Sequence, residues 1–340
     1  MRSKRIISAL MALALCFAVT GCGGDVTPAA SPSDSAQEGA EANSLVFGVS
    51  RQMLTGSLSV REMVDEYNAS NPARPVELVY FDSVQQMLSA MDSGTDVDMY
   101  FTGNYVYELS GRSADLSAYL DTELAPNLQA ALTDENGLRV LPFDFRIELM
   151  VRTVPGEAES LSGVAELARE NNLQLMYGSI PKESVKSYFE PYIWAADEET
   201  RADILSVVEN YDPDPDNDTC AMHPVWLRKG TNFGLSGSDY EETYIPGVPG
   251  VDTLGEYQLE NVFGIFESCS DKDAAWDFLS RLYSSEAQSE TENMPATLSA
   301  LTDYIAFESH YKTTCEQAEK LVWEIIDGTT VSSIYNNPYL

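Results

Sequence analysis

The sequence predicts an α/β protein with two lobes. From Leu45 to Phe101, segments with a strand pattern alternate with segments with a helix pattern, and the joints between them are short. This alternation is typical of a parallel sheet wrapped by helices. About three hundred residues follow the N-terminal leader, which is more than one typical hydrophobic core holds, and a strand–helix pattern returns at Val262.

The chain opens with the pattern of an export signal. Basic residues precede an apolar run from Ile6 to Val19, which ends just before Cys22. The run is shorter than the ~20 residues that a transmembrane helix needs. Val19-Thr20-Gly21-Cys22 resembles the bacterial lipobox, which implies removal of residues 1–21 and lipidation of Cys22, with diacylglycerol and palmitate-type chains as the anchor. The alternative is an ordinary signal peptide with an incidental cysteine.

Residues 22–44 predict a disordered tether. They consist mainly of Gly, Ala, Ser, Pro, Asp and Glu, so they bury too little apolar surface to offset the entropy of ordering. The net charge of the chain is -34, and loss of Arg2, Lys4 and Arg5 with the leader gives -34 - 3 = -37. Such a surface repels nucleic acid and anionic lipid, so nucleic acid is not an expected partner and membrane attachment requires the lipid.

The first predicted elements are two helices and the three strands around them. Ser59 and Glu62 have capping-box spacing ahead of an apolar stripe at i, i+3, i+4 and i+7. Ser83 and Gln86 repeat this spacing, and Gly94 is placed to end the second helix. Strands are expected around these helices over Val46–Val49, Val76–Phe81 and Val97–Phe101.

The later elements are less regular. We expect helices over about 162–170, 184–196 and 199–211, a short apolar run at 173–177, and loops with short strands from 211 to 255. A strand at Val262–Phe266 precedes three more predicted helices. Their cap pairs are Ser270 with Asp273, Ser285 with Gln288, and Thr314 with Gln317, the last helix reaching Gly328.

Several motifs in a shared order resemble those of the extracellular solute-binding proteins of ABC importers, particularly the sugar-binding group. The motifs are Asn71-Pro72, Val76-Glu77-Leu78, the Ser93-Gly94 turn before Asp98-Met99-Tyr100, Asp115-Leu116-Ser117, Leu141-Pro142-Phe143, the stretch Asp273-Ala274-Ala275-Trp276, and Met294-Pro295-Ala296. The resemblance implies a two-lobed periplasmic-binding-protein-like (type II) fold. Family members usually continue past a segment like Val331–Tyr335, so we expect the usual last C-terminal helices to be missing.

The resemblance also implies how the lobes are divided. The N-terminal α/β lobe is expected over 45–148 plus 263–302, and the C-terminal α/β lobe over 149–262 plus 303–340. Strands would cross between the lobes near Phe145–Val151 and Val262–Phe266, and ligand would bind in an interlobe cleft that closes by a hinge.

The candidate ligand-binding residues come from two arguments. Ligands of α/β sheets lie beyond the carboxyl ends of strands, and sugars need apolar faces and planar polar groups. Trp226 is favoured because it lies in an irregular stretch, whereas each aromatic has the alternative of simple core packing. The first lobe offers Ser50, Arg51, Gln52, Thr102, Asn104 and Tyr105, and the second lobe offers Tyr192, Trp194, Trp226, Tyr240 and Tyr244.

The sequence predicts no metal site and no cofactor. The only histidines are His223 and His310, and Cys220, Cys269 and Cys315 are scattered, with at most one disulfide among these three. The acidic run 212–218 permits a calcium hypothesis, but its spacing departs from a calcium loop, so a solvated loop is favoured.

We therefore expect a lipoprotein on the extracellular face of a bacterial cell membrane that is not an enzyme. It would bind a small carbohydrate as a monomer and deliver it to an ABC permease. One alternative is an extracellular glycoside hydrolase, although no pair of carboxylates is singled out for that reaction. The other is a surface lipoprotein that kept the fold and acts as a sensor or adhesion module.

Overall fold

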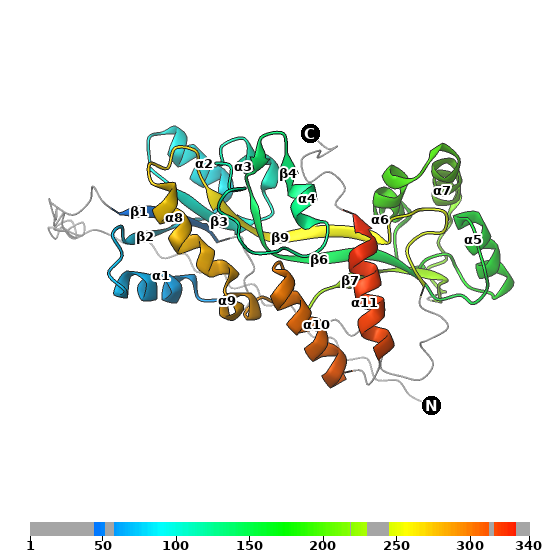
Figure 1. Ribbon diagram of the computed structural model, residues 1–340. Coiled ribbons are helices and arrows are strands. Elements are labelled where there is room, and N and C mark those ends of the chain that lie inside the picture. The colour runs from blue at the N-terminus through cyan, green and yellow to red at the C-terminus, as the bar shows by residue number, and fades with distance from the viewer. Residues whose placement is uncertain (1–43, 52–57, 218, 230–244, 313–315, 331–340) are drawn as a thin grey trace, which may run out of the picture. The chain divides into compact units, whose positions relative to one another are not determined.

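The structure is a computed structural model, and Figure 1 shows its course. It describes residues 44–51, 58–217, 219–229, 245–312 and 316–330. The predicted leader, Cys22 and the predicted tether before Ser44 lie outside the described residues, as do Gln52, Tyr240 and Tyr244.

Three parallel strands begin the fold. They are β1 (Leu45–Ser50), β2 (Val76–Phe81) and β3 (Met99–Gly103), and β1 lies between the other two. The prediction for this region is confirmed, although β3 begins two residues later than expected. The connections are α1 (Val60–Ala69) and α2 (Val84–Asp92).

Both helices begin where their capping residues predict. The Ser59 hydroxyl accepts from the Glu62 amide at 3.3 Å, and the Ser83 hydroxyl accepts from the Gln86 amide at 3.1 Å. Each bond satisfies one of the amides that a helix leaves unpaired in its first turn. Gly94 has a φ of +96°, a conformation that favours glycine, just after α2 ends.

The sheet as a whole is mixed, which corrects the expectation of a parallel sheet. Its main path runs β10-β6-β9-β3-β1-β2, and β9 (Gly255–Ile265) is antiparallel to both β3 and β6 (Leu141–Arg152). The local pattern up to Phe101 contained no information on these strands, because they come from distant parts of the chain. The remaining members are β7 (Met222–Leu227), β8 (Ile245–Pro246), β10 (Met294–Pro295) and β11 (Thr329–Thr330).

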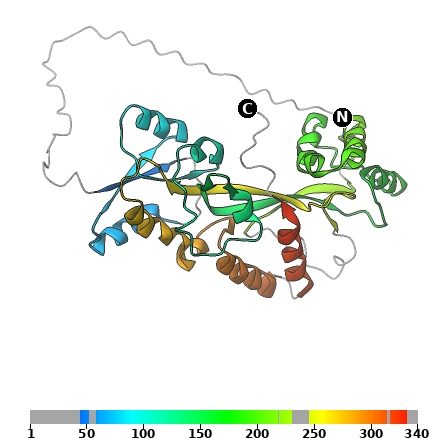
Figure 2. The ribbon, with the colours of Figure 1, turned by 45° about the horizontal axis from the view of Figure 1, so that its top comes forward.

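Helices cover both faces of the sheet (Figures 1 and 2). On one face lie α2, α3 (Val106–Ser110) and α4 (Leu128–Leu132), with the small hairpin of β4 (Thr133–Asp134) and β5 (Gly137–Leu138). The other face carries α1, α8 (Lys272–Leu279), the 3-10 turn Ser280–Tyr283, α9 (Ser285–Ser289), α10 (Leu298–Lys312) and α11 (Glu316–Gly328).

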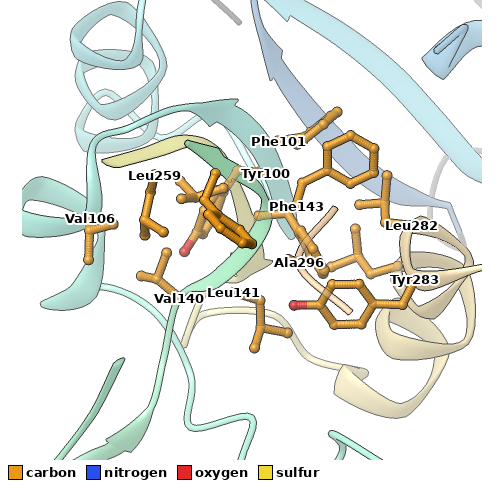
Figure 3. Packing of buried hydrophobic residues seen from close by; sticks show 14 of the residues in the cluster. Tyr100, Phe101, Val106, Val140, Leu141, Phe143, Leu259, Leu282, Tyr283 and Ala296 are labelled. Carbon is orange, nitrogen blue, oxygen red and sulfur yellow. The ribbon is translucent and has the colours of Figure 1, made fainter. Parts of the chain in front are cut away.

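A large hydrophobic core joins these layers. The rings of Phe101 and Phe143 meet edge to face at 5.2 Å between centroids, and those of Phe263 and Tyr283 do so at 5.0 Å. Figure 3 shows Phe101, Phe143 and Tyr283 within this core. The Tyr283 hydroxyl also donates to the carbonyl of Pro142 at 2.9 Å. Each buried aromatic ring of this kind contributes roughly 1.5–3 kcal/mol through burial.

A second, smaller core lies farther along the chain. It is formed by α5 (Leu161–Glu170), α6 (Lys182–Ala195) and α7 (Glu198–Asn210), which pack with Met150 of β6 and Met222 of β7. All three helices were predicted. The apolar run 173–177 forms no strand, and only an isolated bridge joins Gln174 to Cys220.

The predicted division into lobes stays a prediction, but packing bears on its C-terminal part. Ile305 of α10 and Ile325 and Ile326 of α11 belong to the first core, although the sequence placed residues from 303 onward in the second lobe. Helix α10 itself was not predicted, because its apolar residues do not form a single stripe.

Two predicted caps are wrong by one residue. The N-cap of α8 is Asp271, which accepts from the Ala274 amide at 3.1 Å, and not Ser270. The N-cap of α9 is Ser284 and not Ser285. In both cases neighbouring residues can cap equally well, so spacing alone could not decide. Thr314, the third predicted cap, lies outside the described residues.

None of the helices in the described ranges has both the length and the apolar composition that a membrane crossing requires.

Candidate functional site

The two long strands β6 and β9 carry a polar face between the two cores. In register, Arg146 lies opposite Gln258, and Glu148 lies opposite Glu256 on one side and Trp226 of β7 on the other. Directly opposed residues of antiparallel strands share a face. We call these five residues the crossing-strand face. Their neighbours along β6 and β9 are buried, whereas the five side chains themselves are partly or fully exposed.

An irregularity in the strand pairing adds Glu260 to this face. Asp144 pairs with Asn261 and Phe145 pairs with Leu259, so Glu260 is left without a partner of its own. Bulges of this kind re-aim a side chain. Glu260 forms an ion pair with Arg146, with 2.8 Å from its Oε1 to Nε, and both side chains are largely covered, at 21% and 31% exposure.

Arg146 also lies over the indole of Trp226. Its guanidinium carbon is 5.3 Å from the ring centroid, within the range of a cation–π interaction. Trp226 nevertheless keeps 43% of its surface exposed. The ion pair with Glu260 and the contact with Trp226 therefore fix Arg146 from two sides and hold an exposed aromatic ring beside it.

The crossing-strand face carries more negative than positive charge. Glu148, Glu256 and Glu260 give three formal negative charges against one positive charge on Arg146, so the sum is 1 - 3 = -2. Gln258 lies among them and donates from Nε2 to Glu256 Oε2 at 3.3 Å. The arrangement offers carboxylate and amide groups that bind hydroxyls, next to an apolar ring.

A buried carboxylate, Asp144, supports the irregularity. It is 0% exposed and accepts from the Asn261 amide at 2.9 Å, from Asn261 Nδ2, from the Thr291 hydroxyl and from Asn293 Nδ2 at 3.1 Å. Burial raises the pKa of Asp144 to about 6, although these hydrogen bonds act in the opposite direction.

Tyr192 lies at the end of the crossing-strand face nearest the second core. It is 1% exposed, and its hydroxyl accepts from the Met150 amide at 2.7 Å and donates to the Leu254 carbonyl at 3.0 Å. Burial raises the pKa of Tyr192 well above its usual value, and the charges of Glu148 and Glu256 add to this. The ring presents no face to a ligand, so we correct its assignment from stacking to packing.

The structure brings the described first-lobe candidates to one edge of the sheet. Because β1 and β3 are parallel neighbours, their carboxyl ends meet at the same edge of the sheet. Arg51 follows β1 there, Thr102 is the penultimate residue of β3, and Asn104 follows β3. Arg51 is exposed, with Asp82 at 3.6 Å. Thr102 is fully buried, and its hydroxyl has no hydrogen-bond partner among the described residues. Tyr105 is partly buried at the start of α3.

This edge adjoins the crossing-strand face. Gly103 at the end of β3 lies opposite Asn261 in β9, and Asn261 follows Glu260 directly. Trp194, by contrast, is on α6 and is 43% exposed. Its contact with a ligand stays a prediction, as do the contacts of Arg51, Thr102, Asn104 and Tyr105.

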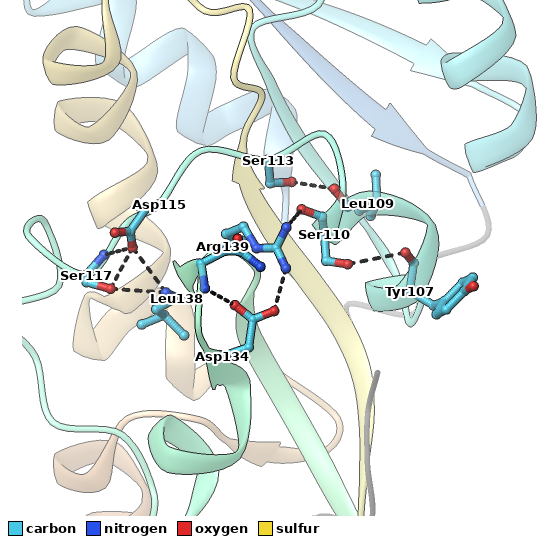
Figure 4. Close-up of polar contacts among 10 residues, drawn as sticks. Tyr107, Leu109, Ser110, Ser113, Asp115, Ser117, Asp134, Leu138 and Arg139 are labelled. Carbon is cyan, nitrogen blue, oxygen red and sulfur yellow. Dashed lines mark hydrogen bonds and ion pairs between the residues drawn. The ribbon is translucent and has the colours of Figure 1, made fainter. Parts of the chain in front are cut away.

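The segment Asp115–Ser117, one of the motifs of the resemblance, is structural. Asp115 accepts from the amide and hydroxyl of Ser117 at 2.9 and 2.6 Å, and from the Leu138 amide at 3.1 Å (Figure 4). Gly137 has a φ of +93°, and a Cβ there would lie 2.2 Å from the Asp115 carboxylate. The contacts hold the β4–β5 hairpin.

Arg139 ties the same hairpin to α3. It donates to the Ser110 carbonyl at 2.7 Å and pairs with Asp134 at 2.5 Å (Figure 4). Helix α3 follows Tyr105, so this network supports the edge of the sheet where the first-lobe candidates lie.

The sequence did not single out five residues of the site, although the signal was present. Polar residues alternate with apolar ones in both crossing strands, which is the pattern of strands with one solvated face. The expectation of a crossing near Phe145–Val151 covered the first of these strands, but its polar positions were not named. The missed residues are Arg146, Glu148, Glu256, Gln258 and Glu260.

The residues that the structure describes contain no group of three or more metal-ligating side chains. In the acidic run 212–218, Asp214 accepts from the amide of Asp216 at 3.1 Å, and Gln174 binds the Asp214 carbonyl at 2.8 Å, while Asp218 lies outside the described residues. Cys269 is a buried free thiol, Cys220 is partly buried, and Cys315 also lies outside the described residues.

Comparisons with known proteins rest on structure. No protein-family model and no curated protein sequence matches this chain. A cyclic α-maltosyl-1,6-maltose binding protein from Arthrobacter globiformis is similar, with a TM-score of 0.59 and 14% identity over 87% of this chain and 90% of that one.

Two further structures agree with it. An extracellular solute-binding protein of family 1 from Alicyclobacillus acidocaldarius has a TM-score of 0.54 and 12% identity, over 85% of this chain and 87% of that one. An ABC substrate-binding protein from Listeria monocytogenes, in complex with cycloalternan, has a TM-score of 0.50 and 14% identity, over 86% and 90%. Together with the mixed sheet and two cores, these similarities show that the chain has the two-lobed α/β fold of extracellular solute-binding proteins.

Proposed function

We propose that this protein is the substrate-binding component of an ABC importer and captures an extracellular carbohydrate. The observation that carries the proposal is the crossing-strand face. Trp226 presents an exposed indole beside Arg146, Glu148 and Gln258, which gives a sugar ring an apolar surface and its hydroxyls planar polar partners.

The structural neighbours support this ligand class. One is named for binding a cyclic maltosyl-maltose, and another was solved with cycloalternan. We propose a carbohydrate of the same general class as ligand, bound at this face without turnover, with the first-lobe edge at Thr102 and Asn104 closing over it by a hinge.

A thermal-shift experiment tests the proposal. A form that begins at residue 23 is melted with and without a panel of neutral oligosaccharides. A ligand at a hundred times its Kd stabilises the folded state by about 2.7 kcal/mol. We expect Trp226→Ala to abolish the shift, whereas Trp276→Phe should keep it, since Trp276 is on α8, outside the crossing-strand face, with its ring 5.9 Å from that of Tyr119 between centroids.

Two results would contradict binding by the crossing-strand face. One is a shift that survives Trp226→Ala unchanged, and the other is no shift with any saccharide. Cleavage of an oligosaccharide in the same incubation would replace binding with the hydrolase alternative. Growth of a deletion strain on the identified sugar tests delivery to a permease, and normal uptake would favour the sensor or adhesion alternative.

We also propose that Cys22 carries the lipid that holds the mature chain, as a monomer, on the extracellular face of the cell membrane. The support is the sequence order of basic residues, apolar run and small residues before Cys22. Labelled palmitate should enter the full chain and not a Cys22→Ala variant. Equal labelling of both would contradict lipidation at this residue.

A further inference from the structure

Two adjacent irregularities interrupt the pairing of β6 and β9. Pro142 pairs with Val262 and Asp144 with Asn261, so Phe143 is skipped on β6, and the next step skips Glu260 on β9. The first core continues on both sides of this point, so the interruption lies within the packed part of the sheet. A ladder hydrogen bond is lost where a residue is skipped, and a buried amide there needs another acceptor.

Asp144 provides this acceptor. Its Oδ1 accepts from the Asn261 backbone amide and from Asn261 Nδ2, both at 2.9 Å. Its Oδ2 accepts from Asn261 Nδ2 at 3.0 Å, from the Thr291 hydroxyl and from Asn293 Nδ2 at 3.1 Å. One fully buried carboxylate therefore joins β6, β9 and the segment that precedes β10.

Three side chains contact one another next to the irregularity. Glu260, the skipped residue, comes within 2.8 Å of Arg146, and Arg146 in turn lies 5.3 Å from the centre of the Trp226 ring. In the described part of the chain, no hydrogen bond joins Asp144 to Glu260, Arg146 or Trp226. Its effect on them passes through the backbone of Asn261, which directly follows Glu260.

We propose that Asp144 is a positioning residue for ligand binding: its ionised carboxylate holds the strand irregularity that sets Glu260 against Arg146, and Arg146 against Trp226. The consequence for binding rests on the proposed function of this face. The positioning of Trp226 itself does not, because it concerns the protein without ligand.

Protonation should release this arrangement. Every contact of Asp144 comes from a donor. The Thr291 hydroxyl can turn to accept a proton and the two Asn side chains could do so only by a flip, whereas the backbone amide of Asn261 cannot accept one. Desolvation raises the pKa of Asp144 to about 6, so the change falls within a convenient pH range.

The titration of other charged groups near Asp144 and Trp226 has to be distinguished from that of Asp144. Glu290 and Glu292 flank Thr291 on the neighbouring segment, and Arg146 and Glu260 lie on the crossing strands. Glu148 lies directly opposite Trp226, and His223 is three residues before it on the same strand. Burial lowers the pKa of His223, so its titration must be removed by substitution.

The test uses 5-fluorotryptophan-labelled protein and 19F NMR between pH 7.5 and 5.0, without ligand. The Trp226 resonance is assigned by Trp226→Phe. We expect it to shift with a midpoint near pH 6 in the wild type and in the controls Glu292→Gln and His223→Gln, and not to titrate in Asp144→Asn. The resonance of Trp194, on α6, should not follow this titration.

A second variant keeps the test decisive if Asp144→Asn does not fold. The Thr291 hydroxyl lowers the pKa of Asp144, so Thr291→Val should move the Trp226 midpoint to higher pH. A midpoint that is unchanged by Thr291→Val, or one that disappears in His223→Gln, would overturn the proposal.

Binding supplies the second readout. If only the ionised form is competent, about a tenth of the protein is competent at pH 5, so saccharide affinity should fall about tenfold between pH 7.5 and 5.0. Saccharide binding with the same pH profile in wild type and Asp144→Asn would overturn the role in binding. A titrating Trp226 resonance with no saccharide bound at any pH would instead overturn the proposed function and leave the positioning intact.

Discussion

Replacement of Tyr192 by phenylalanine should destabilise the protein without a change in ligand affinity. The ring would keep its place in the second core, but the Met150 amide would lose its acceptor and the Leu254 carbonyl its donor. An unpaired buried amide costs about 2 kcal/mol, and the carbonyl, which is less covered, about 1 kcal/mol. We therefore expect the free energy of unfolding to fall by about 3 kcal/mol.

Urea unfolding followed by circular dichroism measures this loss, with Tyr188→Phe as the matched control. Tyr188 is on the same helix and packs partly buried against the same core, and no hydrogen bond of its hydroxyl is found within the described ranges. A loss below about 0.5 kcal/mol, or one equal to that of the control, would refute the hydrogen-bonding argument. A loss of saccharide affinity in the folded variant would return Tyr192 to the ligand candidates.

Three further predictions concern other sites. Asp271→Ala should cost about 1 kcal/mol in urea unfolding and Ser270→Ala much less, since Asp271 caps α8; equal losses would contradict the cap assignment. Burial raises the pKa of Cys269 to about 11, so alkylation of this thiol at pH 8, followed by peptide mass spectrometry, should be far slower in the native than in the unfolded chain. Folding raises the pKa of Asp144 from 3.8 to about 6, so the folded state favours the protonated form, and the stability that this provides is present below pH 4 and falls by about 3 kcal/mol as the pH rises through 6. In urea unfolding, the free energy of unfolding of the wild type should therefore fall by about 3 kcal/mol more between pH 4 and 7.5 than that of Asp144→Asn. Equal changes in the two proteins would contradict this.

The first half of the fold was predictable because its signals are local. Ser59 and Ser83 each cap a helix by a hydrogen bond to the amide three residues later, and short turns separate the apolar runs around these helices. The sheet order was not predictable in this way, because β9 joins β3 through pairs such as Phe101 with Phe263. No pattern within either strand specifies this partner.

The candidate site shows the same limit. Trp226 was named as a ligand candidate because the sequence indicated an irregular stretch there; the structure places it in β7, and its contact with a ligand stays a prediction. Glu260 could not be placed, because its orientation depends on an irregularity that involves Asp144 and Asn261. Tyr192 was misassigned for a related reason: the sequence shows an aromatic on a helix but not which face of the helix is buried.

The sheet topology has a consequence for how the chain reaches its native state. Strand β9 lies between β3 and β6 in the finished sheet, and the bond between Asp144 and Asn261 spans 117 residues. Loops of this length have to close before their contacts stabilise anything, so folding rates fall as contacts become less local. Strands β1, β2 and β3 can pair early, but one edge of β3 stays unpaired until β9 joins it. During that interval the partly folded chain exposes an unpaired strand edge, the feature most prone to aggregation, so its yield should depend on concentration and on chaperones during refolding.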